Sequence, residues 1–167
     1  SWNNTIAEQI EHSAIVLLLV SADFIASSFV YDKELGKVIK NHDLHRARVV
    51  PIILRPCDWL GQIYARLLAL PDGGKAISRW DNRDEALLSI VNAIRQLIDD
   101  LVAYAKYPLG TSPTTYPYDV MIIHSSRDTA TVTDLTTEFR DHKISYWIDR
   151  EQINFGDHIT DKIEDGI

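Results

Sequence analysis

The sequence predicts an α/β fold in which a parallel sheet carries helices on both faces. Two observations lead to this prediction. Apolar runs of six or seven residues recur along the 167-residue chain, and segments with apolar residues at helical spacing separate them. Short continuous apolar runs are typical of strands buried on both faces of a parallel sheet. Their alternation with helices is typical of βαβ units.

The first part of the chain contains two such strands and two amphipathic helices. The strands are predicted at Ala14–Val20 and Val49–Leu54, and the helix between them at Phe29–Asn41. A second helix is predicted at Asp84–Leu101, where apolar residues recur every three or four positions.

A linker and a shorter second part follow. Residues 107–117 contain three prolines and one glycine among Ser and Thr residues, a composition typical of linkers. Beyond them the sequence predicts a strand at Tyr118–Ile123, a helix at Ala130–His142, a strand at Ile144–Ile148 and a final helix carrying Ile159, Ile163 and Ile167.

Composition narrows the class of protein. The formal net charge is −7 and no basic run occurs, which argues against a nucleic-acid partner. The single cysteine, Cys57, cannot form an internal disulfide, and the longest apolar run falls far short of the roughly 20 residues of a membrane helix. We therefore expect a cytoplasmic protein without a membrane partner.

Several segments resemble the Toll/interleukin-1 receptor (TIR) domain family, in its prokaryotic form. Tyr118–Asp128 resembles the opening strand and first loop of that family, and Ile144–Asp149 its second strand. Arg150–Ile167 resembles its BB loop and helix B, and residues 2–101 resemble the rest of the domain. The resemblance implies a flavodoxin-like sheet.

The order of these portions is reversed relative to the family. Residues 1–106 resemble the C-terminal portion of a TIR domain and residues 118–167 the N-terminal portion, with the linker 107–117 between them. Residues 1–10 and 158–167 both resemble the same helix B. Three interpretations stay open: a slice across two tandem domains, a permuted single domain, or a longer chain with parts omitted. The portions could complete one another within one chain or by a domain swap in a homo-oligomer.

Glu34 is the candidate catalytic residue. A carboxylate beside an oxocarbenium-like centre can stabilise the developing positive charge or orient the attacking group. TIR enzymes that cleave the nicotinamide glycosidic bond of NAD⁺ carry a glutamate in the matching helix, so the resemblance implies this role for Glu34. The family often has Trp four residues earlier, where this chain has Val30. The alternative is a solvated helix glutamate.

Ligands of open α/β folds bind beyond the carboxyl ends of the strands. With the resemblance, this rule gives a candidate substrate-binding set of His124, Ser125, Ser126, Trp59, Asp149 and Gly156. The alternatives are a turn closed by Ser and Asp128 side chains, and core or rim packing for Trp59. The candidate interaction loop contains Arg150, Phe155 and Gly156.

The leading prediction is therefore an NAD⁺ nucleosidase that hydrolyses or cyclises its substrate in signalling or antiphage defence, with no resident cofactor. A non-catalytic adaptor that binds other TIR domains is the main alternative. A receiver-like protein phosphorylated on Asp149 or Asp23 is a weaker one. His42 and His45 lie three apart with no Cys or third His nearby, so we predict no metal site.

Overall fold

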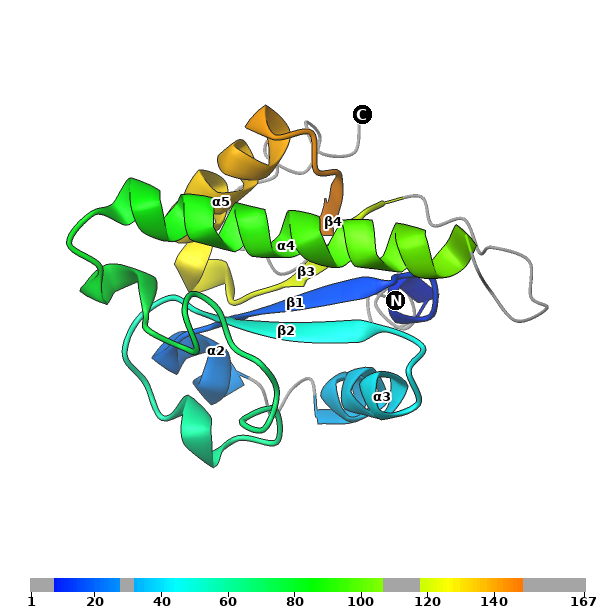
Figure 1. The fold of residues 1–167 in the computed structure, drawn as a ribbon. Coiled ribbons are helices and arrows are strands. Elements are labelled where there is room, and N and C mark those ends of the chain that lie inside the picture. The colour runs from blue at the N-terminus through cyan, green and yellow to red at the C-terminus, as the bar shows by residue number, and fades with distance from the viewer. Residues whose placement is uncertain (1–7, 28–31, 107–117, 149–167) are drawn as a thin grey trace.

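The computed structural model describes residues 8–27, 32–106 and 118–148, with a four-stranded parallel sheet at the centre (Figure 1). The elements in chain order are β1 (Ile15–Val20), α2 (Ala22–Ser27), α3 (Asp32–Asp43), β2 (Arg48–Ile53), α4 (Arg83–Lys106), β3 (Val120–Ile123), α5 (Thr129–Asp141) and β4 (Tyr146–Ile148). Single 3-10 turns lie at Trp59–Gly61, Ile77–Arg79 and Ser126–Asp128.

The strand order is β2-β1-β3-β4, with every neighbouring pair parallel. If the strands are renumbered 1 to 4 in the order β3, β4, β1, β2, the sheet read from β4 to β2 has the order 2-1-3-4. A flavodoxin-like sheet begins with this order. Leu70 adds a parallel bridge to Ile52 on the outer side of β2, at the position of a fifth strand. The fold is therefore α/β and flavodoxin-like, as the sequence predicts.

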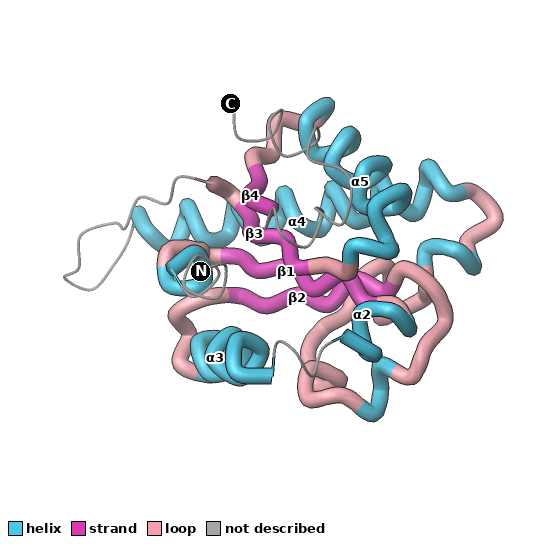
Figure 2. The backbone as a smooth tube through the Cα atoms, turned by 180° about the vertical axis from the view of Figure 1, so that it is seen from behind, coloured by secondary structure: helices cyan, strands magenta, loops and turns pink. Residues whose placement is uncertain are grey.

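Two apolar layers sandwich the sheet. Helices α4 and α5 cover one face, where Leu17, Ile90 and Phe139 are fully buried together. Helices α2 and α3 and the segment 62–76 cover the other, where Leu18, Phe24 and Tyr64 are buried. Figure 2 shows the two helix pairs on opposite sides of the strands. Because strand side chains alternate between faces, neighbouring leucines of β1 serve different layers.

β1 joins the two portions of the chain. All six of its residues are buried, and it pairs with β2 on one side and with β3 on the other. Val16 to Leu18 lie opposite Met121 to Ile123, residues from beyond position 118. The portions on either side of residues 107–117 thus share one sheet.

β2 alternates its backbone bonds between two neighbours. The amides of Arg48 and Leu54 donate to Ala14 and Val20 at 2.8 Å, on the β1 side. On the outer side, the Val49 amide donates to Nδ1 of His42 at 3.0 Å and the Ile53 amide to the Leu70 carbonyl at 2.8 Å. Pro51 lies between them and has no amide hydrogen, which suits an outward-facing position.

The predicted strands and helices are all observed where the structure describes them, with ends shifted by a few residues. Two features differ from the prediction. α4 continues to Lys106, past the predicted end at Leu101, and α2 forms directly after β1, where no separate helix was predicted. The linker 107–117 and the predicted final helix lie outside the described residues.

Candidate functional site

The end of β1 supplies the first polar groups at the carboxyl edge of the sheet. Ser21 follows β1 directly and is fully buried. Its hydroxyl oxygen accepts a hydrogen bond from the Phe24 amide at 3.1 Å, which starts α2, and its hydroxyl hydrogen is donated to Asp128 at 2.5 Å. One serine therefore begins a helix and contacts a residue 107 positions away.

The end of β2 supplies a cation. Arg55 lies two residues after β2 and contacts two carboxylates, Asp23 of α2 at 2.9 Å and Asp128 at 2.7 Å. The hydrogen bond to Asp23 is the main cause that raises the pKa of Arg55, with Asp128 acting in the same direction. The guanidinium stays charged and the Arg55 side chain is 46% exposed, so it links the edge to solvent.

The end of β3 supplies a short loop. His124 follows β3 and is wholly buried, and its Nδ1 lies 2.8 Å from the Ser125 carbonyl oxygen. Burial lowers the pKa of His124. The Ser125 hydroxyl accepts from the Arg127 amide at 3.2 Å, and the Thr129 hydroxyl donates to the Ser126 carbonyl at 2.6 Å. These bonds close a 3-10 turn that leads into α5.

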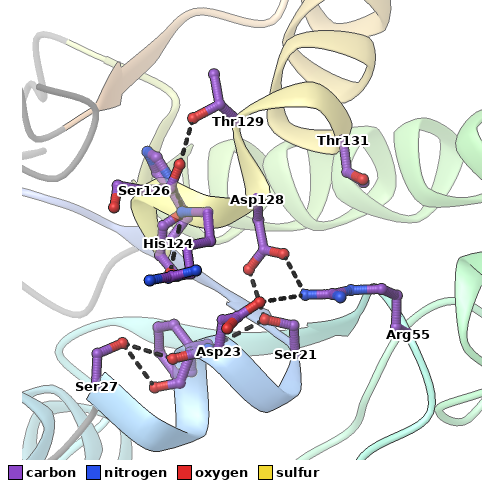
Figure 3. Close-up of polar contacts among 12 residues, drawn as sticks. Ser21, Asp23, Ser27, Arg55, His124, Ser126, Asp128, Thr129 and Thr131 are labelled. Atoms are coloured by element: carbon purple, nitrogen blue, oxygen red, sulfur yellow. Dashed lines mark hydrogen bonds and ion pairs between the residues drawn. The ribbon is translucent and has the colours of Figure 1, made fainter. Parts of the chain in front are cut away.

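Asp128 is the centre of the arrangement (Figure 3). Its side chain is 3% exposed and accepts hydrogen bonds from Ser21 and Arg55. It occupies the N-cap position of α5, where Asp is favoured, yet it makes no capping bond. Its carboxylate is used across the sheet edge instead. Charge-assisted hydrogen bonds contribute about 1.5–3 kcal/mol each, and the half-exposed guanidinium places its bond at the low end.

Trp59 lies four residues after Arg55 in the chain. It starts the turn Trp59–Gly61, is partly buried and packs against the core layer of α2 and α3. Its ring also faces Gly74, where an added Cβ would lie 2.5 Å from Cζ2. Nearby, burial raises the pKa of the half-buried Cys57 thiol, which makes it a poor nucleophile.

His42 and His45 lie near the end of α3 and in the turn that follows it. His42 accepts the Val49 amide, while His45 has a φ of 57° in the turn after α3. Within the described ranges, no group of three or more His, Cys, Asp and Glu side chains is placed to hold a metal ion. No helix in the same ranges is both long and apolar enough to cross a membrane.

Comparison with known proteins found a relative of this chain. The chain is similar to uncharacterized protein y4lF of Sinorhizobium fredii (strain NBRC 101917 / NGR234), with 41% identity over 106 residues. The match covers 64% of this chain and 33% of the relative, so the chain spans about a third of that protein's length. No family model matches the sequence. No solved structure matches it either.

The structure describes only part of the predicted site. Ser125 and Ser126 lie in the loop after β3, with Ser126 the more exposed of the two. Glu34 lies in the first turn of α3, but its side chain is not among those described. The predicted residues of the loop after β4 lie outside the described residues, namely Asp149, Arg150, Phe155 and Gly156.

Sequence reasoning missed the network formed by Ser21, Asp23, Arg55 and Asp128. Each of these residues lies within a few positions of a strand's carboxyl end. The rule that ligands bind beyond these strand ends therefore pointed to their segments. The pairing itself had no local signal, because Arg55 and Asp128 are 73 positions apart. Only the relative placement of the two portions reveals it.

Proposed function

We propose that this chain is a TIR-type NAD⁺ nucleosidase in which Glu34 is the catalytic carboxylate. The observation that carries the proposal is the gathering of three strand ends at one edge of a flavodoxin-like sheet. The loop with Ser125 and Ser126, the Arg55 segment and α2 meet there. α3, which carries Glu34, follows α2 in the chain.

Two further observations support the TIR interpretation. Counted from β3, the sheet has the strand order of the fold that the resemblance implies, with Leu70 in the fifth position. The segments on either side of residues 107–117 also share one sheet, as complementary portions of one domain would.

In the proposed reaction, the bond between the ribose C1′ and the nicotinamide nitrogen breaks, and its electron pair leaves with nicotinamide. The positive charge that develops on the ribose is stabilised by the Glu34 carboxylate. Water then adds to C1′ and releases a proton, giving ADP-ribose; attack by an adenine nitrogen would give a cyclic product. Ser125 and Ser126 offer hydroxyls and backbone groups to the ribose and phosphates.

Chromatography of NAD⁺ and nicotinamide tests the proposal. Glu34→Gln should lower the cleavage rate by at least about a hundredfold, as expected for loss of a positioned carboxylate. Glu85→Gln is the matched control, because Glu85 is an exposed glutamate in the first turn of α4, on the opposite face of the sheet. Persistence of NAD⁺ with the wild-type chain at high protein concentration would refute the proposal.

A non-catalytic adaptor that binds other TIR domains is the second candidate. One observation favours it: Leu60, Ile63 and Leu68 are 58–77% exposed on the segment after β2. Large apolar side chains gathered on a surface often mark contacts between proteins. In this case Leu68→Asp or Phe155→Ala would reduce oligomer size on gel filtration, and the wild-type chain would not consume NAD⁺.

A further inference from the structure

The contact between Asp128, Ser21 and Arg55 joins the two portions of the chain at the candidate site. Ser21 and Arg55 belong to the portion before residue 107, and Asp128 belongs to the portion after residue 117. The carboxylate is buried and has donors at 2.5 and 2.7 Å. Arg55 also contacts Asp23, so the contact extends into α2.

This contact is separate from the bonds that shape the loop. Ser125, Ser126 and Thr129 close the turn within residues 124–129. Asp128 does not cap α5, although it occupies the capping position. Its side chain therefore ties the finished turn to β1 and β2, and does not build the turn.

The same contact leads toward Glu34. Asp23 lies in α2, and α3 is the next helix along the chain. The path Asp128–Arg55–Asp23 thus connects the loop that carries Ser125 and Ser126 with α2, which shares its buried layer with α3 through Phe24 and Leu35. A ligand held by that loop would be placed relative to α3 through this path.

We infer that Asp128 is a positioning residue: through Ser21 and Arg55 it sets the loop 124–128 relative to α2 and α3. The inference rests on the proposed function for its kinetic consequence. A misplacement of about 1 Å in a reacting site can cost about a hundredfold in rate. Loss of the contact should therefore lower kcat more than it raises KM.

Two variants test the inference, and each is compared with a control. Asp128→Asn removes the charge that Arg55 contacts, and Arg55→Gln removes the cation while leaving Ser21 bonded to Asp128. Each should lower kcat at least about tenfold, with a smaller change in KM. Amide hydrogen exchange should become faster in both residues 124–129 and residues 22–27. Arg55→Lys should recover part of the rate, since an ammonium can pair with Asp128 but spans two carboxylates poorly.

The control is Arg83→Gln, which removes the Arg83–Asp134 pair between α4 and α5. That pair also joins the two portions, at 3.0 Å and with half-exposed side chains. Arg83→Gln should leave kcat and the amide hydrogen exchange of residues 124–129 and 22–27 unchanged. The inference is overturned if folded Asp128→Asn and Arg55→Gln keep wild-type exchange in both segments, or keep wild-type kcat in an active enzyme. A wild-type chain that leaves NAD⁺ intact refutes the proposed function, and exchange then decides the positioning role by itself.

Discussion

At the scale of single residues, one side chain often serves two elements of this protein. Ser21 starts α2 and bonds Asp128, and His42 lies in the last turn of α3 and bonds the first outward amide of β2. Such residues couple local structure to the rest of the fold. Their substitution should have effects beyond their own element.

His42 should make stability depend on pH. Burial is the main cause that lowers the pKa of His42, and the charge of Arg48 is the second. Arg66 and His45 lower this pKa further, whereas Asp43 raises it. Nδ1 accepts the Val49 amide only while it is unprotonated. His42 therefore binds a proton more tightly in the unfolded chain than in the folded one. Its contribution to the stability of the fold is complete above about pH 6.5 and is lost as the pH falls through the lowered pKa of His42 in the folded state.

Urea unfolding near pH 7.5 and near pH 5.5 measures this effect. His42→Asn keeps an acceptor for the Val49 amide but does not titrate, so its stability should fall less in acid than that of the wild type. Some fall should remain, because the buried His124 also has a lowered pKa. His12→Asn is the control, because it makes the same substitution at an exposed histidine. Equal losses in His42→Asn and wild type would contradict the assignment.

Gly74 should be intolerant of a side chain. Its φ is 108°, and a Cβ would lie 2.5 Å from the Trp59 ring. Gly74→Ala should cost about 1–3 kcal/mol of unfolding free energy from backbone strain and overpacking. Gly73 has a φ of 74° and open space around it, so Gly73→Ala isolates the strain and should cost less. Thermal unfolding of both variants checks the order.

At the scale of elements, the interior position of β1 and the amphipathic helices make the fold predictable from sequence. The predicted strand begins one residue before the observed start of β1, and the predicted helix begins one residue after the observed start of α5. Both have strong apolar patterns. α2 has only Phe24 buried among its six residues and follows β1 after a single residue, so it left no periodic signal of its own. Tertiary contacts, including the Ser21 hydroxyl, define it.

α4 allows a matched comparison within one helix. Ile90 is fully buried against the sheet, whereas Leu88, two residues earlier, is 43% exposed. Ile90→Ala should lower the free energy of unfolding by about 2–5 kcal/mol, because it leaves a cavity in the layer under α4 and α5. Leu88→Ala should cost less than about 1 kcal/mol. Similar losses for both would mean that α4 does not present this face to the core.

At the scale of the whole molecule, two portions of the chain form one sheet. The seam includes the β1–β3 pairing, the bond from Arg95 to the His142 carbonyl, the Arg83–Asp134 pair and the contacts of Asp128. The sequence predicted both portions and their common fold class. It did not predict which side chains would meet across the seam, because those pairs depend on how the portions dock.

The seam should hold the portions together after the chain is cut. A protease site placed within residues 107–117 would leave the pairing of Val16–Leu18 with Met121–Ile123 intact. Gel filtration should show the two pieces eluting together under native conditions and apart in urea. Separate elution under native conditions would mean that the covalent connection maintains the seam.

The outer side of β2 limits how copies of this protein can associate. A sheet edge with unpaired amides is a template on which a strand of another molecule can pair, which is a common route to aggregation. Between Val49 and Ile53, β2 presents no such amide: His42 accepts one, Leu70 accepts another, and Pro51 lacks a hydrogen. This stretch is therefore protected against strand addition, and assembly there must use side-chain surfaces instead of backbone pairing.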